Sequence, residues 1–185
     1  LPTSTEDRSD REAVKGKLSG RTQEIQRLIG RSLRNICDLS LLRENLIKID
    51  CDVISADGGT RTASINGSWI ALKLAFDKLI RKKIIVQNPI KSGLSAISCG
   101  IVKNNILLDL DYLEDSNADA DANFVFDNEG KIVEIQCTGE RRAISNDEFS
   151  EMFNIAKDAC TKIYLLQKNS TIKGEKNKFN FSDSE

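Results

Sequence analysis

Apolar residues recur every three or four positions in two stretches of the first half of the chain, which is the spacing of a helix with one buried face. The first stretch runs from Thr22 to Asp38 and carries Ile25, Leu28, Ile29, Leu33, Ile36 and Cys37. The second stretch ends before Arg81 and carries Ile65, Trp69, Leu72, Phe76 and Leu79. The pattern therefore predicts two amphipathic helices.

Shorter apolar runs, with the alternation or the length of a strand, occupy the middle of the chain. Residues 46–54 alternate apolar with charged side chains and predict a strand that ends at Asp57-Gly58-Gly59. Strands are also predicted for residues 96–102, 106–110, 123–126 and 131–136. The turn sequence Asn128-Glu129-Gly130 joins the last two of these as a hairpin.

Ser145 and Glu148 form the signature of a capping box at the start of a final helix, whose apolar side carries Phe149, Met152, Phe153, Ala156, Cys160 and Ile163. From about Asn169 the chain is polar and has no period, so we expect residues 169–185 to form a polar C-terminal tail that is disordered or loosely attached. The order helix, strand, helix, strands, helix favours an α/β or α+β sheet with helices on one face. Because the chain begins on a helix, we expect the first strands of its sheet to lie outside this sequence.

The composition excludes several classes of protein. With 185 residues, of which 39% are hydrophobic and 30% charged, and a net charge of −1, the chain fits one globular domain or two small lobes that share a core. It has no run of about 20 apolar residues and no signal-peptide features in residues 1–8, so we expect a soluble protein. Its five widely spaced cysteines argue against a disulfide framework or a zinc knuckle and favour the reducing cytoplasm.

Histidine is absent from the sequence. Imidazole is the most frequent general base near neutral pH, so its absence excludes Ser-His-Asp hydrolysis, Cys-His proteolysis, His-ligated zinc chemistry and ribonuclease chemistry based on a histidine pair. Any chemistry must therefore use carboxylates, arginines, hydroxyls, backbone amides or a metal ion.

Two basic features are candidates for binding an anion. Arg27, Arg31 and Arg34 share the polar side of the first predicted helix, which is either a solvated face or an anion-binding surface. The segment 57–62, Asp-Gly-Gly-Thr-Arg-Thr, lies where a strand passes into a helix, where glycines allow close backbone approach and free amides favour an anion. An ordinary turn with a helix cap would explain the glycines and threonines of this segment, but it gives no reason for Arg61, whose planar guanidinium suits two phosphate oxygens.

Eight acidic residues occur between positions 109 and 129 without an intervening Lys or Arg: Asp109, Asp111, Glu114, Asp115, Asp119, Asp121, Asp127 and Glu129. Close carboxylates repel one another, and a bound divalent cation is the simplest relief, although a solvated acidic loop is the alternative. For a metal site of this kind, magnesium or manganese suits phosphoryl chemistry better than zinc.

Three strings in the sequence carry a family resemblance: GRTQEIQRLIGR at 20–31, IDCDVISADGGTRTASI at 49–65 and LDLDYLEDS at 108–116. They closely resemble bacterial ribonuclease PH, and the likeness extends over one domain, residues 1–168. The resemblance implies an α+β, ribonuclease PH-like fold, with a mixed or antiparallel sheet, helices packed on its faces and N-terminal strands that precede Leu1. It also implies a phosphorolytic exoribonuclease, a nucleotidyltransferase that trims the 3′ ends of transfer-RNA precursors and releases nucleoside diphosphates.

The resemblance also assigns roles to residues. The phosphate-binding residues are Arg21, Gly59, Thr60 and Arg61. Asp115 and Asp121 are the catalytic residues and the ligands of a magnesium ion, with manganese as the alternative, and inorganic phosphate is the co-substrate. Arg8 and Arg11 are expected to guide the RNA through contacts that weaken with salt.

The family resemblance implies a homo-oligomer, a hexamer built as a trimer of dimers, in the cytoplasm and without a membrane partner. Two alternatives to the enzyme remain at the level of the sequence. One is a non-catalytic RNA-binding ring subunit or an inactive fragment of the enzyme. The other is a metal-dependent hydrolytic nuclease, which would leave Arg21 and Arg61 without a purpose.

Overall fold

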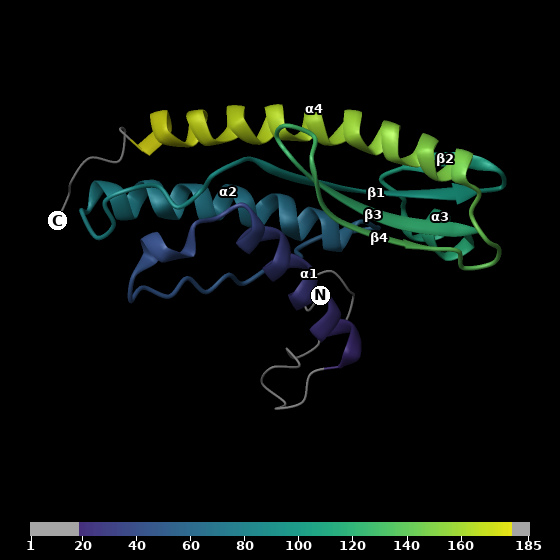
Figure 1. Cartoon of the computed structure of the whole chain (residues 1–185), viewed down its shortest axis with the longest axis horizontal. Coiled ribbons are helices and arrows are strands. Elements are labelled where there is room, and N and C mark those ends of the chain that lie inside the picture. The colour runs from purple at the N-terminus through teal and green to yellow at the C-terminus, as the bar shows by residue number, and fades with distance from the viewer. Residues whose placement is uncertain (1–18, 179–185) are drawn as a thin grey trace.

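The computed structural model describes residues 19–178, with side chains up to residue 172, and it is an α+β structure, as the sequence predicts (Figure 1). Its elements in chain order are α1 (Gly20–Asn35), the 3₁₀ helix η2 (Leu39–Leu42), α2 (Thr60–Arg81), β1 (Leu94–Val102), β2 (Asn105–Leu108), α3 (Tyr112–Asn117), β3 (Ala120–Asp127), β4 (Ile132–Thr138) and α4 (Asn146–Lys178). Arg8 and Arg11 lie outside the described residues.

The four strands form one antiparallel sheet in the order β2-β1-β3-β4. The predicted hairpin between β3 and β4 is confirmed, and its turn is held by Asp127, whose Oδ1 accepts hydrogen bonds from the amides of Glu129 (2.8 Å) and Lys131 (2.9 Å). Strand β1 is central, and it pairs with β3 so that Gly100 is opposite Asp121. This pairing places Asp121 near one end of the sheet.

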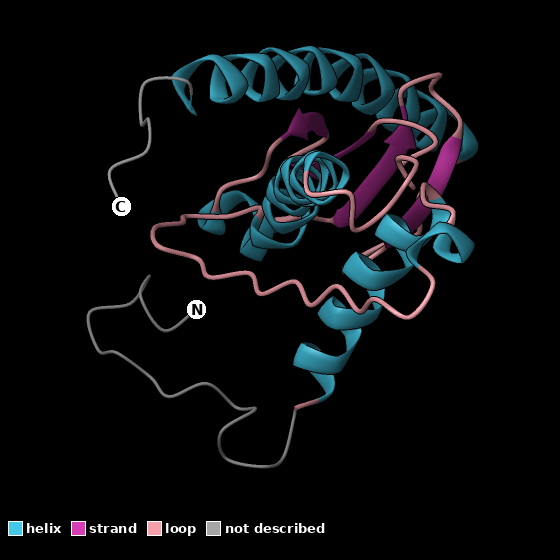
Figure 2. Cartoon of the chain, turned by 90° about the vertical axis from the view of Figure 1, so that its left-hand side faces the viewer, coloured by secondary structure: helices cyan, strands magenta, loops and turns pink. Residues whose placement is uncertain are grey.

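Helices cover both faces of the sheet, with α4 on one side and α1 and α2 on the other (Figures 1 and 2). Alternate residues of a strand point to opposite faces, and β1 is buried on both. Leu94 and Ala96 pack in the core formed with α1 and α2, whereas Ile97, Cys99 and Ile101 pack in the core formed with α4. The expectation of helices on one face is therefore wrong. The side chains of β1 that point to each face of the sheet are small or apolar, so both faces are covered by helices.

Residues 46–54, which the alternation predicts as a strand, form part of a long loop between η2 and α2 (Figure 2). Leu46 and Ile54 are 76% and 79% exposed. An alternating segment becomes a strand only when a neighbour accepts its backbone hydrogen bonds, and within residues 19–178 no strand pairs with it. A cavity of about 760 Å³, lined mainly by apolar side chains, lies between this loop, α1 and α2.

Helix α4 begins at the predicted capping box, in which the Glu148 amide donates to Ser145 Oγ (3.2 Å) and the Ser145 amide donates to Glu148 Oε2 (2.9 Å). It continues to Lys178, so the part of the expected tail from 169 to 178 is helical instead of disordered. Gln167 and Thr171 are buried, and Gln167 donates from Nε2 to the Asn66 carbonyl (3.2 Å) on α2, so this part of the polar sequence packs against the fold. Among the described helices, none is long and apolar enough to cross a membrane.

Candidate active site

The start of α2 is fixed by a close backbone contact. Gly58 forms an isolated antiparallel bridge with Asp111, just before α3. A Cβ atom on Gly58 would lie 2.1 Å from the Leu110 carbonyl oxygen, so a side chain has no room there. Gly59 follows with φ +58°, a left-handed conformation that favours glycine, and it is the N-cap residue of α2. Gly58 therefore allows two backbone segments to approach closely, while the expected approach of this backbone to an anion stays a prediction.

We expect Gly58→Ala to lower the free energy of unfolding by about 1–3 kcal/mol, because the new methyl group forces the start of α2 away from Leu110. Gly67→Ala is the matched control, since Gly67 lies on the exposed side of α2 with nothing within 4 Å of its would-be Cβ atom. That control should raise stability by about 0.5–1 kcal/mol, the usual gain from replacing glycine inside a helix. Chemical denaturation of the two variants checks both signs, and equal stabilities would contradict the close contact.

The acidic residues do not form one cluster. Asp111 caps α3, with Oδ1 accepting from the Glu114 amide (2.7 Å) while Glu114 Oε2 accepts from the Asp111 amide (3.0 Å). Asp127 holds the β3–β4 turn at the other end of β3. The interpretation of all eight carboxylates as a single cation site is therefore wrong, because several of them satisfy backbone amides at turns and a helix start.

Several of the other charged side chains line a polar cavity of about 420 Å³. It is lined by Arg21, Arg61, Asp115, Ser116, Ala118, Asp121, Glu140 and Arg141. These residues come from the first turns of α1 and α2, from α3, from β3 and from the loop after β4. The structure thus brings together four of the predicted site residues, Arg21, Arg61, Asp115 and Asp121.

Gly59 and Thr60, the other two predicted phosphate-binding residues, do not line this cavity. Gly59 precedes Arg61 by two positions and sets the start of α2, and Thr60 lines the larger apolar cavity instead. Both residues directly precede Arg61 at the start of α2. The Arg61 guanidinium lies 3.6 Å from the Glu24 carboxylate on α1, so this contact ties together the first turns of α1 and α2.

The surroundings of Asp121 disfavour the charged form of its carboxyl group. Burial raises the pKa of its carboxyl group above the ordinary value, and the negative charges of Asp115 and Glu140 raise it further, whereas Arg61 opposes the shift. Within the described part of the chain, Asp121 Oδ1 and Arg61 Nε are buried without a hydrogen-bond partner. Buried polar atoms are nearly always paired in folded proteins. The site therefore offers one unused acceptor and one unused donor to a ligand.

These features fit a divalent cation held through few protein ligands. Magnesium is usually bound by one or two carboxylates together with water and substrate phosphates, and Asp115 and Asp121 supply carboxylates in one cavity. Over residues 19–178, no group of three or more His, Cys, Asp or Glu side chains is arranged to hold a metal ion. The donor set suits a hard cation that shares its coordination with a phosphate, and it does not suit zinc.

Glu140 and Arg141 belong to the site but were not predicted from the sequence. They follow β4 and the pair Thr138-Gly139, in a stretch with no periodic pattern. The sequence offered only indirect evidence for them. Glu140-Arg141-Arg142 is a charged run between a strand and a capping box, and a loop in that place lies at the end of the sheet.

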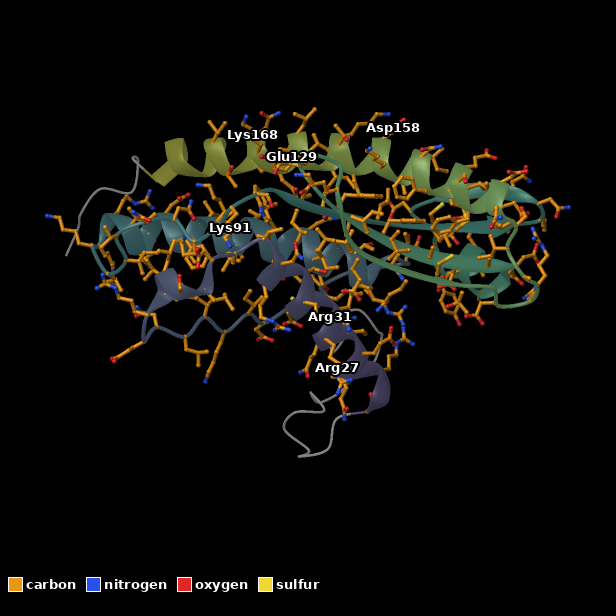
Figure 3. The ribbon with its side chains drawn as sticks, viewed as in Figure 1. Arg27, Arg31, Lys91, Glu129, Asp158 and Lys168 are labelled. Carbon is orange, nitrogen blue, oxygen red and sulfur yellow. The ribbon has the colours of Figure 1, made fainter. Side chains whose placement is uncertain are left out.

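The arginines on α1 divide into two roles. Arg27 and Arg31 lie on the exposed side of the helix (Figure 3), as predicted. Arg31 pairs with Glu134 on β4, with Nε 3.1 Å from Oε2, so it fastens α1 to the edge of the sheet. Arg21, at the start of the same helix, is the arginine that lines the polar cavity.

Comparison with known proteins identifies the family. The model for domain 1 of the 3′ exoribonuclease family matches residues 1–76, and the model for domain 2 matches residues 94–159. The chain therefore belongs to the 3′ exoribonuclease family.

Solved structures share the fold at low sequence identity. The rice (Oryza sativa) protein Rrp46 is 19% identical, with a TM-score of 0.63 over 84% of this chain and 68% of the rice chain. A chain of an archaeal exosome core is 20% identical, with a TM-score of 0.62 over 82% of this chain and 66% of its own. A chain of the Archaeoglobus fulgidus exosome with RNA bound to the active site is 19% identical, with a TM-score of 0.65 over 88% of this chain and 66% of its own. This chain thus spans about two thirds of their length.

Proposed function

We propose that this chain is a phosphorolytic 3′ to 5′ exoribonuclease, which shortens the 3′ ends of RNA, transfer-RNA precursors among them, by using inorganic phosphate. The observation that carries the proposal is the single cavity lined by Arg21, Arg61, Asp115 and Asp121, which come from four different elements. Two guanidiniums beside two carboxylates match the chemistry of phosphoryl transfer, and family membership supports the same reaction class.

In this reaction a hydrogen phosphate ion attacks the phosphorus of the last phosphodiester. A bond forms between the attacking oxygen and phosphorus, and the bond from phosphorus to the 3′ oxygen of the preceding nucleotide breaks. The last nucleotide leaves as a nucleoside diphosphate, and the proton of hydrogen phosphate ends on the new 3′ hydroxyl. Atoms and charge balance, and no histidine is needed.

Arg21 and Arg61 would act on this reaction through position and charge. Their guanidiniums hold the incoming phosphate in one orientation and offset the charge that spreads over the phosphoryl oxygens in the transition state. Asp115 and Asp121 would hold magnesium, with manganese as the alternative. When bound there, the ion stabilises negative charge on the leaving 3′ oxygen.

The test is the product formed by the purified full-length protein from a transfer-RNA precursor labelled at its 3′ end. We expect nucleoside diphosphates, formed only when phosphate is added. Nucleoside monophosphates formed without phosphate would contradict phosphorolysis and would favour a hydrolytic nuclease.

A non-catalytic RNA-binding ring subunit is the second candidate, because two of the structures that share the fold are described as exosomes. RNA binding without any product, with or without phosphate, would favour it. We further propose that the working form is a cytoplasmic homo-oligomer, a hexamer built as a trimer of dimers, and the mass of the purified protein in solution tests that assembly.

A further inference from the structure

The polar cavity contains a third arginine, Arg141, whose position differs from those of the other two. Arg21 and Arg61 belong to the first turns of α1 and α2. Arg141 comes from the loop between β4 and α4, and its Nη2 donates to the carbonyl of Ser116 on α3 (3.2 Å). Arg141 therefore contacts the helix that carries Asp115, while the other two arginines come from α1 and α2.

The loop holds Arg141 in a fixed place. The Arg141 amide donates to the Asp119 carbonyl (3.0 Å), which ties the loop to the start of β3. The next residue, Arg142, donates from Nη2 to Glu148 Oε1 (2.6 Å), and its Nε lies 3.9 Å from Asp119 Oδ2. Both ends of the loop are thus anchored, one to the strand that carries Asp121 and one to the first turn of α4.

These anchors preorganise the arginine for a ligand. A guanidinium has five N–H donors in a fixed plane, and one of them is used on Ser116. The ion pair of Arg142 and Glu148 also persists in acid, since the pKa of Glu148 falls to about 2 through its hydrogen bonds to Arg142 and Ser145. The Arg141 side chain is exposed and lines the cavity together with the carboxylates, so its remaining donors are open to a ligand.

The cavity is lined by three arginines and three carboxylates, so their formal charges cancel unless a divalent cation binds to the carboxylates. One hydrogen phosphate with two negative charges is matched by the two guanidiniums of Arg21 and Arg61. The proposed reaction also brings a second phosphorus into the site, that of the scissile phosphodiester, and Arg141 is a third guanidinium in the cavity that could bind it. It becomes the α-phosphate of the released nucleoside diphosphate.

We infer that Arg141 binds the scissile phosphodiester of the RNA, while Arg21 and Arg61 bind the attacking phosphate. The inference rests on the proposed function, because only phosphorolysis places two phosphoryl groups side by side here. It predicts a specific difference between two ligands. A nucleoside diphosphate uses all three arginines, whereas inorganic phosphate uses two.

Calorimetric titration of the full-length protein with ADP and with inorganic phosphate, each with magnesium present, tests this inference. Arg141→Ala should weaken ADP binding by about 10- to 100-fold, the effect of losing a charged hydrogen bond, and should change phosphate binding by less than about 2-fold. Arg141→Gln, which keeps a donor for Ser116, should show the same loss if the charge is what matters. Arg81→Ala is the matched control, since it removes an exposed arginine at the far end of α2 and should change neither affinity.

Each outcome decides a different claim. If the unaltered protein binds neither ADP nor phosphate, the proposed function and the role of Arg141 both fall. If it binds both and the Arg141 variants bind ADP equally well, only the role of Arg141 falls. An equal loss of ADP and phosphate would place Arg141 on the attacking phosphate and would also overturn the inference.

Discussion

Asp121→Asn is expected to lower the rate of RNA phosphorolysis by about 10²- to 10³-fold and, at the same time, to make the metal-free protein more stable. The two effects share one cause. Burial and the charges of Asp115 and Glu140 make the folded protein an unfavourable place for a charged Asp121, so its pKa is raised. A site of this kind costs stability until a cation is bound.

The sign of the pH dependence follows from that raised pKa. Below the ordinary value of 3.8 the carboxyl group is protonated in the folded and unfolded chains alike, so the substitution should change stability little. As the pH rises above 3.8, the unfolded chain releases this proton first, and the cost to the folded chain grows until the pH exceeds the raised pKa. At about pH 7, in a chelator, we expect Asp121→Asn to melt at a higher temperature than the unaltered protein.

Thermal melts over a pH series, read beside initial rates of phosphorolysis, check both halves of this prediction. Adding magnesium should raise the melting temperature of the unaltered protein more than that of the variant. Asp158→Asn is the matched control, because Asp158 lies on the outer side of α4 (Figure 3) and is exposed. A loss of stability in Asp121→Asn at neutral pH, or full activity, would remove Asp121 from the proposed role.

Arg61→Ala is expected to raise the KM for phosphate by about 10-fold and to lower kcat by about 10²-fold, while the Kd for RNA changes by less than about 2-fold. The guanidinium is partly buried and its Nε has no partner among the residues that the structure describes, which fits a group reserved for substrate. The loss in kcat reflects charge that grows on the phosphoryl oxygens as the reaction proceeds.

Phosphate titrations at saturating RNA, with RNA affinity measured separately by fluorescence anisotropy, provide the measurement for Arg61. Arg81→Ala again controls for the loss of one positive charge. If Arg61→Ala weakened RNA binding and left the dependence on phosphate unchanged, Arg61 would belong to the RNA path and not to the phosphate site.

The sequence predicted those features that depend on neighbours along the chain. Three features are local: the apolar period of α1 and α2, the β3–β4 turn, and the capping box at Ser145 and Glu148. Each of them was predicted from a few neighbouring residues. The strand expected at 46–54 failed because strand formation depends on a partner strand, which an alternating pattern alone does not supply. The length of α4 was not predicted for a similar reason, since the contact of Gln167 with Asn66 on α2 is not visible in a polar sequence.

The candidate site was predictable only in part. Arg61 stood out because a turn gives no reason for it, and the resemblance to ribonuclease PH supplied the roles of Arg21, Asp115 and Asp121. Arg141 was not predicted, since its importance comes from a loop that packs against Ser116 and Asp119, and no pattern of spacing records such a contact. The acidic run was misleading because capping carboxylates and site carboxylates look the same in a sequence.

The central claim is that an oxyanion is held by Arg21 and Arg61 next to Asp115 and Asp121. The anomalous difference map of crystals of the full-length protein soaked in tungstate, an electron-rich mimic of phosphate, tests it most directly. We predict a tungsten peak in the cavity that Asp121 lines, placed so that the oxygens of the tungstate accept hydrogen bonds from both guanidiniums. A map with tungsten bound elsewhere and none in this cavity would contradict the account.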